Sequence, residues 1–221
     1  MKPIKEAWAT RPSKFKRWSA TAAVLLLVIG CGRDESDEVL THKALSERGI
    51  VAVAGSERYP FDTVGDQRAF TDAWVAAKVV SEAVGEIEGD GDREGYQQRS
   101  VRLRVEGTLW QRPDVEVPEQ IEFETGLIVS DHEASYAVGE GGVPVVVGQR
   151  YLVGLIRTSE GTLDLANPRS IKDLDQRDHV IVAGEPTPAE TFVEQIVDAD
   201  PSVPDEIVDP AERLEIWHAS H

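Results

Sequence analysis

The stretch Ser100-Val101-Arg102-Leu103-Arg104-Val105-Glu106 alternates apolar and polar or charged side chains without a break. Successive side chains of a β-strand point to opposite faces, so its two valines and its leucine share one face and its charged residues share the other. Residues 119–125 repeat the pattern, with Ile121 and Phe123 on one face and glutamates on the other. Both segments predict half-buried strands, which indicates a sheet with one face in solvent.

The two segments also predict one antiparallel register. Setting Arg104 opposite Glu122 brings unlike charges together on the exposed face. The same alignment pairs Arg102 with Glu124, Leu103 with Phe123 and Val105 with Ile121. Because a slip by one residue would turn every apolar side chain to solvent, we expect the buried face to set this register and the charges to agree with it.

Further short apolar segments, punctuated by Gly and Pro, predict a mainly β fold. They are residues 50–54, 74–84, 143–147, 151–156, 162–165 and 179–183. Segment 74–84 can be a helix or a strand. Trp74, Ala77 and Val84 would line one face of a helix, whereas the Val79-Val80 pair favours a strand. Residues 55–69 are expected to be loop. Short strands at near-regular spacing are typical of a small antiparallel barrel or a sandwich.

Two capping signals predict short C-terminal helices. Thr187-Pro188-Ala189-Glu190 fits a capping box with Thr187 as N-cap and the proline at the first helical position, in a helix that runs to about Asp198. Asp209-Pro210-Ala211-Glu212 repeats the signal. Apolar stripes that we expect to pack on the barrel follow: Phe192, Val193, Ile196 and Val197 in the first helix, and Leu214, Ile216 and Trp217 in the second. Binding of a partner is the alternative role for the second stripe.

The first 30 residues have the layout of a secretory signal peptide. Basic residues up to Arg17 precede the uncharged segment 18–30, which is shorter than the roughly 20 residues of a bilayer-spanning helix. Gly30 is small enough for a signal-peptidase site, and the single cysteine of the chain, Cys31, follows it. This layout predicts export. With Cys31 modified, the folded part has no disulfide and no thiolate metal site.

Val28-Ile29-Gly30-Cys31 resembles the lipobox of bacterial lipoproteins. The resemblance, which covers residues 1–31, implies that Cys31 receives a diacylglyceryl group, becomes the new amino terminus after cleavage, and is acylated there as well. Two acyl chains are enough for stable anchoring. The resemblance therefore implies a cell-membrane anchor on the extracytoplasmic face. A plain signal peptide and an uncleaved anchor are the alternatives.

A second resemblance concerns the body of the chain. The order of its segments is similar to that of uncharacterised exported bacterial domains with an oligonucleotide/oligosaccharide-binding-like (OB-like) barrel. These segments are an apolar strand, a polar loop, the alternating 101–105 strand, Glu106-Gly107-Thr108-Leu109-Trp110 and later 148–153. The resemblance covers about half of the chain. It carries over no activity, because the inhibitory members of that architecture rely on cysteines that are absent here.

These patterns divide the chain into four parts. They are a lipoprotein signal peptide (1–30), an acidic, disordered tether (31–49), an OB-like barrel or sandwich domain (50–185), and C-terminal helices with a tail (186–221). The expected fold class is thus mainly β, a small antiparallel OB-like barrel or sandwich with short C-terminal helices.

The charge distribution restricts the partners. Residues 1–30 hold six of the 23 basic side chains and one of the 40 acidic ones, so the rest of the chain has a net charge of −22. Such a surface repels nucleic-acid phosphates and anionic lipid headgroups, which argues against nucleic acid and leaves the lipid on Cys31 as the contact with the membrane. An envelope protein or glycan remains as the partner class.

No segment carries a complete catalytic, metal or cofactor motif. Asp90-Gly91-Asp92-Arg93-Glu94-Gly95 imitates the start of a calcium loop, but its twelfth position is Val101 instead of glutamate, so an acidic hairpin loop is expected. Asp131-His132-Glu133 joins three ligand types, yet sequence neighbours rarely converge on one ion. We therefore expect a binding or scaffolding module of the cell envelope. A hydrolase that uses carboxylates, with candidates among Asp131, Glu133 and Glu140, is the alternative.

Overall fold

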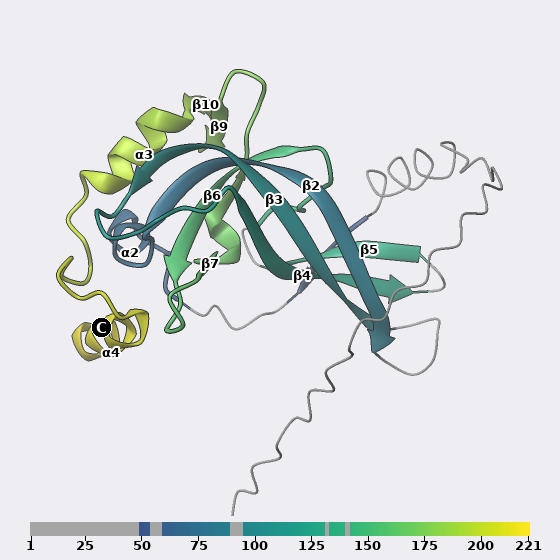
Figure 1. Ribbon diagram of the computed structural model, residues 1–221, viewed down its shortest axis with the longest axis horizontal. Coiled ribbons are helices and arrows are strands. Elements are labelled where there is room, and N and C mark those ends of the chain that lie inside the picture. The colour runs from purple at the N-terminus through teal and green to yellow at the C-terminus, as the bar shows by residue number, and fades with distance from the viewer. Residues whose placement is uncertain (1–48, 54–58, 89–94, 131–132, 140–141) are drawn as a thin grey trace, which may run out of the picture. The chain divides into compact units, whose positions relative to one another are not determined.

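The computed structural model describes residues 49–53, 59–88, 95–130, 133–139 and 142–221 (Figure 1). Its strands are β1 (Ile50–Val53), β2 (Ala73–Glu88), β3 (Gly95–Gln111), β4 (Gln120–Ser130), β5 (Glu133–Gly139), β6 (Arg150–Arg157), β7 (Leu163–Leu165), β8 (Ile171–Asp173), β9 (His179–Val182) and β10 (Glu185–Pro188). Its helices are α2 (Val64–Ala69), the 3-10 helix η1 (Pro168–Ser170), α3 (Ala189–Val197) and α4 (Pro210–Ser220). The mainly β fold with short C-terminal helices is confirmed, and segment 74–84 is a strand. None of the helices in these ranges is long and apolar enough to span a membrane.

Eight strands form one sheet in the order β1-β5-β4-β3-β2-β6-β7, with β8 also paired to β6. Neighbouring strands are antiparallel except β1 and β5, which run parallel. The sheet curls into a half-barrel, and β9 and β10 form a separate two-stranded ribbon (Figure 1). The antiparallel barrel expected from the strand pattern is therefore present as a half-barrel.

β3 and β4 are antiparallel partners as predicted, but the predicted register is wrong by two residues. Arg102, not Arg104, lies opposite Glu122, and Leu103 lies opposite Ile121. A shift of two keeps every side chain on its predicted face, so the burial pattern does not distinguish the two registers. The charges favour the predicted register, which opposes two arginine–glutamate pairs, whereas the observed register opposes one, Arg102 with Glu122.

The contact that distinguishes the registers lies near the start of β3. The ring of Tyr96 packs over Gly126, where a side chain on the glycine would collide with it. The observed pairing of Gln98 with Gly126 makes this possible, because it places Tyr96 diagonally across from the glycine. An aromatic ring over a bare glycine stabilises the pairing of the two strands.

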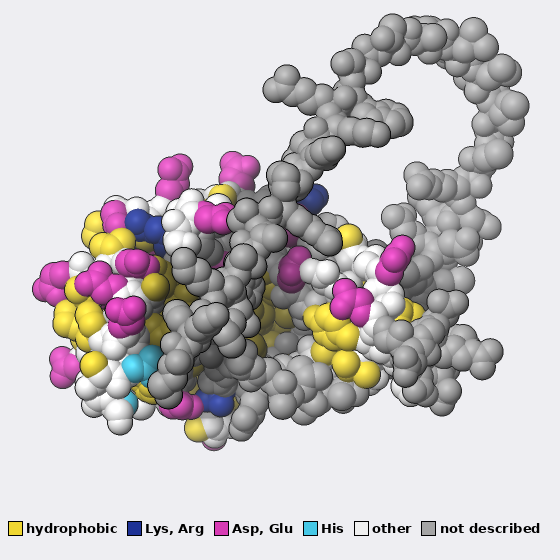
Figure 2. All heavy atoms as spheres, turned by 90° about the horizontal axis from the view of Figure 1, so that it is seen from below, with side chains coloured by type: hydrophobic (Ala, Val, Ile, Leu, Met, Phe, Trp, Pro, Cys, Tyr) yellow, Lys and Arg dark blue, Asp and Glu magenta, His cyan; other side chains and the backbone are white. Residues whose placement is uncertain are grey.

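Acidic side chains are spread over the face of the described part that Figure 2 shows, with few basic ones between them. The whole chain has a formal net charge of −17, so this surface follows directly from the composition. Its field attracts cations and repels anions.

One apolar cluster fills the concave face of the half-barrel. Its members include Val75 and Val79 of β2, Val101 and Leu103 of β3, Ile121 and Phe123 of β4, Tyr151 and Val153 of β6, and Ile171 of β8. Side chains from β4 and β8, which are far apart in the strand order, meet in this cluster because the sheet curls. The predicted inward faces of 100–106 and 119–125 are confirmed.

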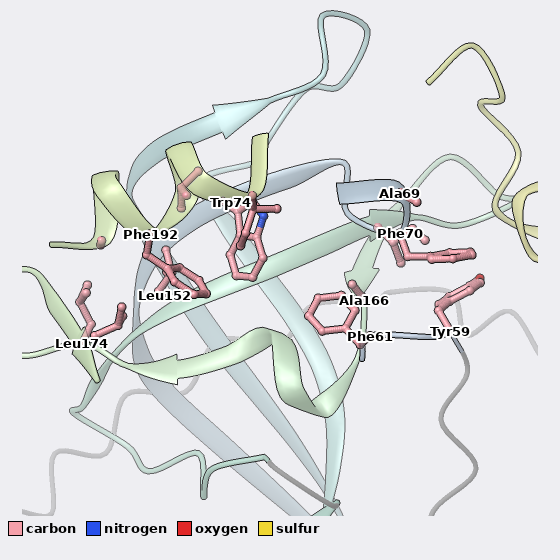
Figure 3. Packing of buried hydrophobic residues seen from close by; sticks show 14 of the residues in the cluster. Tyr59, Phe61, Ala69, Phe70, Trp74, Leu152, Ala166, Leu174 and Phe192 are labelled. Atoms are coloured by element: carbon pink, nitrogen blue, oxygen red, sulfur yellow. The ribbon is translucent and has the colours of Figure 1, made fainter. Parts of the chain in front are cut away.

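A second apolar cluster covers the outer face of β2 and β6. Trp74 and Leu152 pack under α3, where the ring of Phe192 meets that of Trp74 edge to face, with 5.8 Å between centroids (Figure 3). The α3 stripe is thus docked on the sheet as expected. Because β2 and β6 are covered on both faces, residues 73–79 and 151–156 are nearly all buried and apolar.

Residues 143–147 do not form the predicted strand. Pro144 has no N–H for a strand ladder, and the chain here runs between two apolar clusters that take up Val145 and Val146. The Tyr151 hydroxyl accepts from Val146 N at 2.8 Å and donates toward Pro144 O at 2.9 Å. A side chain therefore satisfies backbone groups that a neighbouring strand would otherwise pair.

The expected loop 55–69 contains a helix, α2, which corrects the prediction. Thr63 and Asp66 form a capping box, in which Thr63 Oγ1 accepts from Asp66 N and Asp66 Oδ2 accepts from Thr63 N, both at 3.0 Å. Gly65 lowers the helix propensity of this segment, so the two caps decide its conformation.

α3 begins one residue later than expected, and Thr187 is not its N-cap. Thr187 lies in β10 opposite Val180, so Pro188 is the N-cap residue instead. The side chain of Pro188 accepts no hydrogen bond. Asp178 O accepts from Ala189 N at 2.8 Å instead. The strand pairing thus replaces the side-chain cap.

α4 begins with Asp209 as its N-cap, as predicted, with Asp209 Oδ1 accepting from Ala211 N at 3.0 Å. Arg213, which is 1% exposed, donates to Asp72 Oδ1 at 2.8 Å and to Ala69 O at 3.0 Å. The stripe of Leu214, Ile216 and Trp217 lies half-buried against the outer cluster. The second helix is therefore docked as well.

Candidate functional site

A groove runs between the C-terminal part of β3 and α3. Two hollows of about 390 and 400 Å³ make it up, and Gly107, Leu109 and Glu190 line both. One hollow extends past the start of α3 toward Arg150, and the other follows α3 to Asp198. Because they share these residues, they form one continuous surface, the β3–α3 groove.

The groove exists because β4 leaves β3 before β3 ends. The last pair of these strands is Arg104 with Gln120, followed by a single bond from Val105 N to Glu119 O of 2.9 Å. β3 then continues to Gln111, paired only with β2. One edge of this part of β3 is consequently free of a neighbouring strand.

Two bulges shape the unpaired part of β3. The pairing with β2 skips Glu106 and again Leu109. A bulge leaves one residue without a partner, increases the local twist and turns side chains in new directions. Bulged edges also resist pairing with a further strand. A ligand at this edge can therefore contact side chains of β3, but it cannot form a regular ladder of backbone hydrogen bonds.

Gly107 forms the open centre of the groove. A Cβ atom at this position would meet no atom within 4 Å, and the backbone lies outside the left-handed region that favours glycine. The fold does not require a glycine here. Because Gly107 has no side chain, the centre of the groove stays open.

Acidic and apolar side chains alternate along the α3 wall. Glu190, Glu194 and Asp198 line the groove at successive turns, with Val193 and Val197 between them. The three acids are exposed, and no ion pair within the described residues involves them. This wall therefore carries three uncompensated negative charges.

The floor of the groove is apolar. Ala76, Leu109 and Trp110 form it, and all three are only partly buried against the outer cluster. The guanidinium of Arg68 stacks over the Trp110 ring, 4.8 Å from its centroid, and so holds the ring in place. An apolar floor beside charged walls is the usual composition of a binding site.

At the other end of the groove, Arg150 is already neutralised. Its Nε donates to Glu106 Oε2 and its Nη2 to Asp178 Oδ1, both at 2.7 Å. These hydrogen bonds, first the one with Glu106, raise the pKa of Arg150. Arg177 also lines this end. The negative potential is thus concentrated along the α3 half of the groove.

A further hollow of about 600 Å³ lies around β8 and β9 and shares Arg150 and Leu174 with the Arg150 end of the groove. Asp173 lines it, and desolvation raises the pKa of this carboxyl. Asp175 lines it too, with its Oδ1 accepting from His179 N at 2.9 Å and lying 3.5 Å from His179 Nδ1. The backbone hydrogen bond from His179 is the main cause that lowers the pKa of Asp175. The hollow therefore holds two carboxyls whose pKa values are moved in opposite directions.

Most residues singled out from the sequence lie outside the described ranges. Among them are Cys31, 90–94, Asp131, His132 and Glu140. Glu133 begins β5 and is exposed. β2 and β3, which segment 89–94 joins, are antiparallel partners, as the expected hairpin requires. Within the described part of the chain, no three His, Cys, Asp or Glu side chains come together as ligands for a metal ion.

No protein-family model, curated protein or solved structure matches the chain. The β3–α3 groove is therefore interpreted from its own chemistry.

No pattern in the sequence predicted the groove. The spacing of Glu190, Glu194 and Asp198 was the one available signal, because residues four apart share a helix face. An acidic helix face is usually only solvated. What makes this one part of a groove is β3, which comes much earlier in the chain and which no sequence pattern places beside α3.

Proposed function

We propose that this chain is a bacterial lipoprotein, anchored through lipid on Cys31 at the extracytoplasmic face of the cell membrane, whose β domain binds an envelope partner. The proposal for binding rests on one observation, the β3–α3 groove with its apolar floor, its uncompensated acidic wall and its open centre at Gly107. The proposal for the anchor rests on residues 28–31 and on the presence of a single cysteine.

Two physical arguments support binding. The floor residues Leu109 and Trp110 stay partly exposed although they adjoin a buried cluster, so a ligand that covers them gains hydrophobic free energy. The acids on α3 have no ion-pair partner in the part of the chain that the structure describes, so they keep their charge available for a ligand. An anchored protein also needs no tight groove, because confinement at the membrane raises the effective concentration of an envelope partner.

The groove is tested by filling it. A photo-crosslinking amino acid at the exposed, groove-lining position of Thr108 should yield one discrete adduct in intact cells. Gly107→Leu should abolish that adduct, because a Cβ at this position meets no atom and the rest of the leucine side chain then fills the groove. Ala83→Leu, which adds bulk at an exposed position of β2, should leave it unchanged. No adduct, or an adduct that Gly107→Leu leaves intact, would contradict binding in the groove.

The anchor is tested at its only acylation site. Cys31→Ser should either leave an uncleaved precursor or release the protein from the membrane fraction, because the serine hydroxyl is not lipidated. Membrane partition of a normally processed Cys31→Ser chain would overturn the anchor.

A hydrolase that uses carboxylates is the second candidate, and the hollow around β8 favours it. General acid and base pairs have carboxyls whose pKa values are pushed apart, and Asp173 and Asp175, which both line this hollow, have pKa values moved in opposite directions. Turnover of an envelope substrate that Asp173→Asn abolishes would establish this function. Retention of turnover in that variant would exclude Asp173 as the acid.

A further inference from the structure

We infer that the β3–α3 groove takes an extended peptide segment of a partner protein that carries lysine or arginine at alternate positions, held by the side chains of α3. This inference rests on the proposed binding function and names its ligand class.

The charge of the ligand follows from the wall of the groove. Glu190, Glu194 and Asp198 present three negative charges, while the basic residues of the groove gather at its other end, where Arg150 is paired with Glu106 and Asp178. A cationic ligand gains attraction along the α3 wall without displacing an existing ion pair. An anionic ligand would meet three like charges.

The spacing of the ligand's charges follows from helix geometry. Acids four residues apart on α3 are separated by about 6 Å along the helix axis. Alternate side chains of an extended chain point the same way and are about 6.6 Å apart. A lysine at every second position therefore meets Glu190, Glu194 and Asp198 in succession.

The positions between the lysines face the opposite way, toward the β3 wall and the floor. Leu109, Trp110 and Ala76 are apolar there, and Gly107 leaves room for a side chain. Small apolar residues such as valine fit these positions. The ligand is thus an alternating basic and apolar segment, which distinguishes it from a flexible polyamine that carries charge alone.

The bulges decide how this segment is held. Strand addition needs a regular row of free N–H and C=O groups, and the bulges at Glu106 and Leu109 break that row on β3. The segment is therefore held by its side chains, and its backbone amides contribute little.

The test uses the full chain and the synthetic peptide acetyl-Ser-Lys-Val-Lys-Val-Lys-Ser-amide, with glutamate in place of lysine in a control peptide. The lysine peptide should bind, and the glutamate peptide should not. Glu190→Lys with Glu194→Lys should weaken binding by about tenfold or more, since it turns two attractions into repulsions. Glu160→Lys with Glu185→Lys changes the net charge equally at exposed positions outside the groove and should leave the affinity within about twofold.

Equal weakening by both double variants would overturn the inference, because it would show attraction by the overall charge only. Methylation of alternate amide nitrogens in the peptide should leave its affinity nearly unchanged. An approximately tenfold loss on methylation would overturn binding by side chains in favour of strand addition to β3.

The two proposals fail in distinguishable ways. If the Thr108 adduct forms and Gly107→Leu removes it, but the lysine peptide neither binds nor competes, the binding function stands and the inferred ligand class is wrong. If no adduct forms and no peptide binds, both are wrong.

Discussion

Arg213 connects two parts of the chain that are far apart in sequence, residues 69–72 and residues 207–213. Its guanidinium donates to the carboxylate of Asp72 just before β2, to the carbonyl of Ala69 at the end of α2, and to the carbonyl of Ile207 before α4. Asp72 also lies 2.9 Å from Arg112 Nε. Buried charges lose their hydration, so they are stable only when geometry and hydrogen bonds compensate for it, as they do here.

Replacing Arg213 should therefore be costly. Arg213→Met removes one partner of a buried pair and leaves buried carbonyls without donors, so we expect the free energy of unfolding to fall by about 3–5 kcal/mol. Urea denaturation measures the loss. Arg102→Met is the control, because Arg102 pairs with Glu122 on the exposed face and should lose only a small fraction of that amount. Comparable losses in both variants would contradict this role for Arg213.

At the scale of elements, β2 and β6 are central because both of their faces are packed. Gly154 of β6 lies under the Trp74 ring, which in turn contacts Phe192 of α3. A side chain at Gly154 would lie 2.9 Å from Trp74 Cη2 and 3.0 Å from Ser170 Cβ. The glycine thus sets how closely α3 approaches the sheet.

Gly154→Ala should lower the free energy of unfolding by about 1–3 kcal/mol, because the added methyl overpacks this contact. Gly107→Ala is the matched control at an open position and should change the free energy by less than about 0.5 kcal/mol. Thermal or urea unfolding compares the two. A neutral Gly154→Ala would show that Trp74 and α3 move aside without cost.

The register of β3 and β4 is testable by crosslinking in a Cys31→Ser background. Arg102→Cys with Glu122→Cys should form a disulfide readily, because directly opposite residues have Cα atoms about 4.5–5.5 Å apart. Arg104→Cys with Glu122→Cys is the control, since these residues are diagonal and lie about 7 Å or more apart. Preferential crosslinking of 104 to 122 would restore the register predicted from the sequence.

At the scale of the whole molecule, two groups define a window of pH stability. Burial raises the pKa of Asp66, but hydrogen bonds from Thr63 and Trp217 outweigh burial and hold this pKa below its ordinary value of 3.8. A carboxyl with a lowered pKa stabilises the fold above the unfolded value, and this contribution is lost as the pH falls below about 3.8.

Tyr151 sets the alkaline limit. Desolvation raises the pKa of its hydroxyl above the ordinary 10.0, against the opposing effect of the Val146 hydrogen bond. Because the folded state retains this proton more tightly, stabilisation is complete below pH 10 and falls as the unfolded chain ionises above it.

We therefore expect the free energy of unfolding to be highest between about pH 5 and pH 9 and to fall on both sides. Asp66→Asn should make the acid side less steep, and Tyr151→Phe should do the same on the alkaline side while lowering stability throughout, because Val146 N loses its acceptor. Urea denaturation across the pH range checks both slopes. Unchanged slopes in the variants would assign the pH dependence to other groups.

The acidic surface also acts on the whole molecule. Residues 31–221 carry a net charge of −22, so any cationic ligand is attracted over distances near the Debye length, about 8 Å at physiological salt. The β3–α3 groove combines this field with an apolar floor beside a row of acids that have no ion-pair partner among the described residues. Selectivity therefore has to come from the groove, and the field contributes mainly to the rate of encounter.

Features that depend on local periodicity were predictable from the sequence. The alternation in 100–106 and 119–125 determined which faces are buried, because a strand has a side-chain period of two whatever its neighbours are. Asp209 was predictable as an N-cap, because its hydrogen bond reaches only two residues along the chain. The apolar run 151–156 was predictable as a strand because a short continuous apolar segment is itself a local signal of a strand buried on both faces.

Features that depend on contacts between distant segments were decided only by the tertiary structure. The ring of Tyr96 over Gly126 selected a register that burial left undetermined and that charge did not favour. Thr187 pairs with Val180 in the ribbon of β9 and β10 and is therefore not the N-cap of α3. The departure of β4 from β3 opened the groove that α3 borders. In each case the local conformational preference of a residue contributes a few tenths of a kcal/mol up to about 1 kcal/mol. Packing between segments that are far apart in the sequence contributes more and therefore decides the conformation.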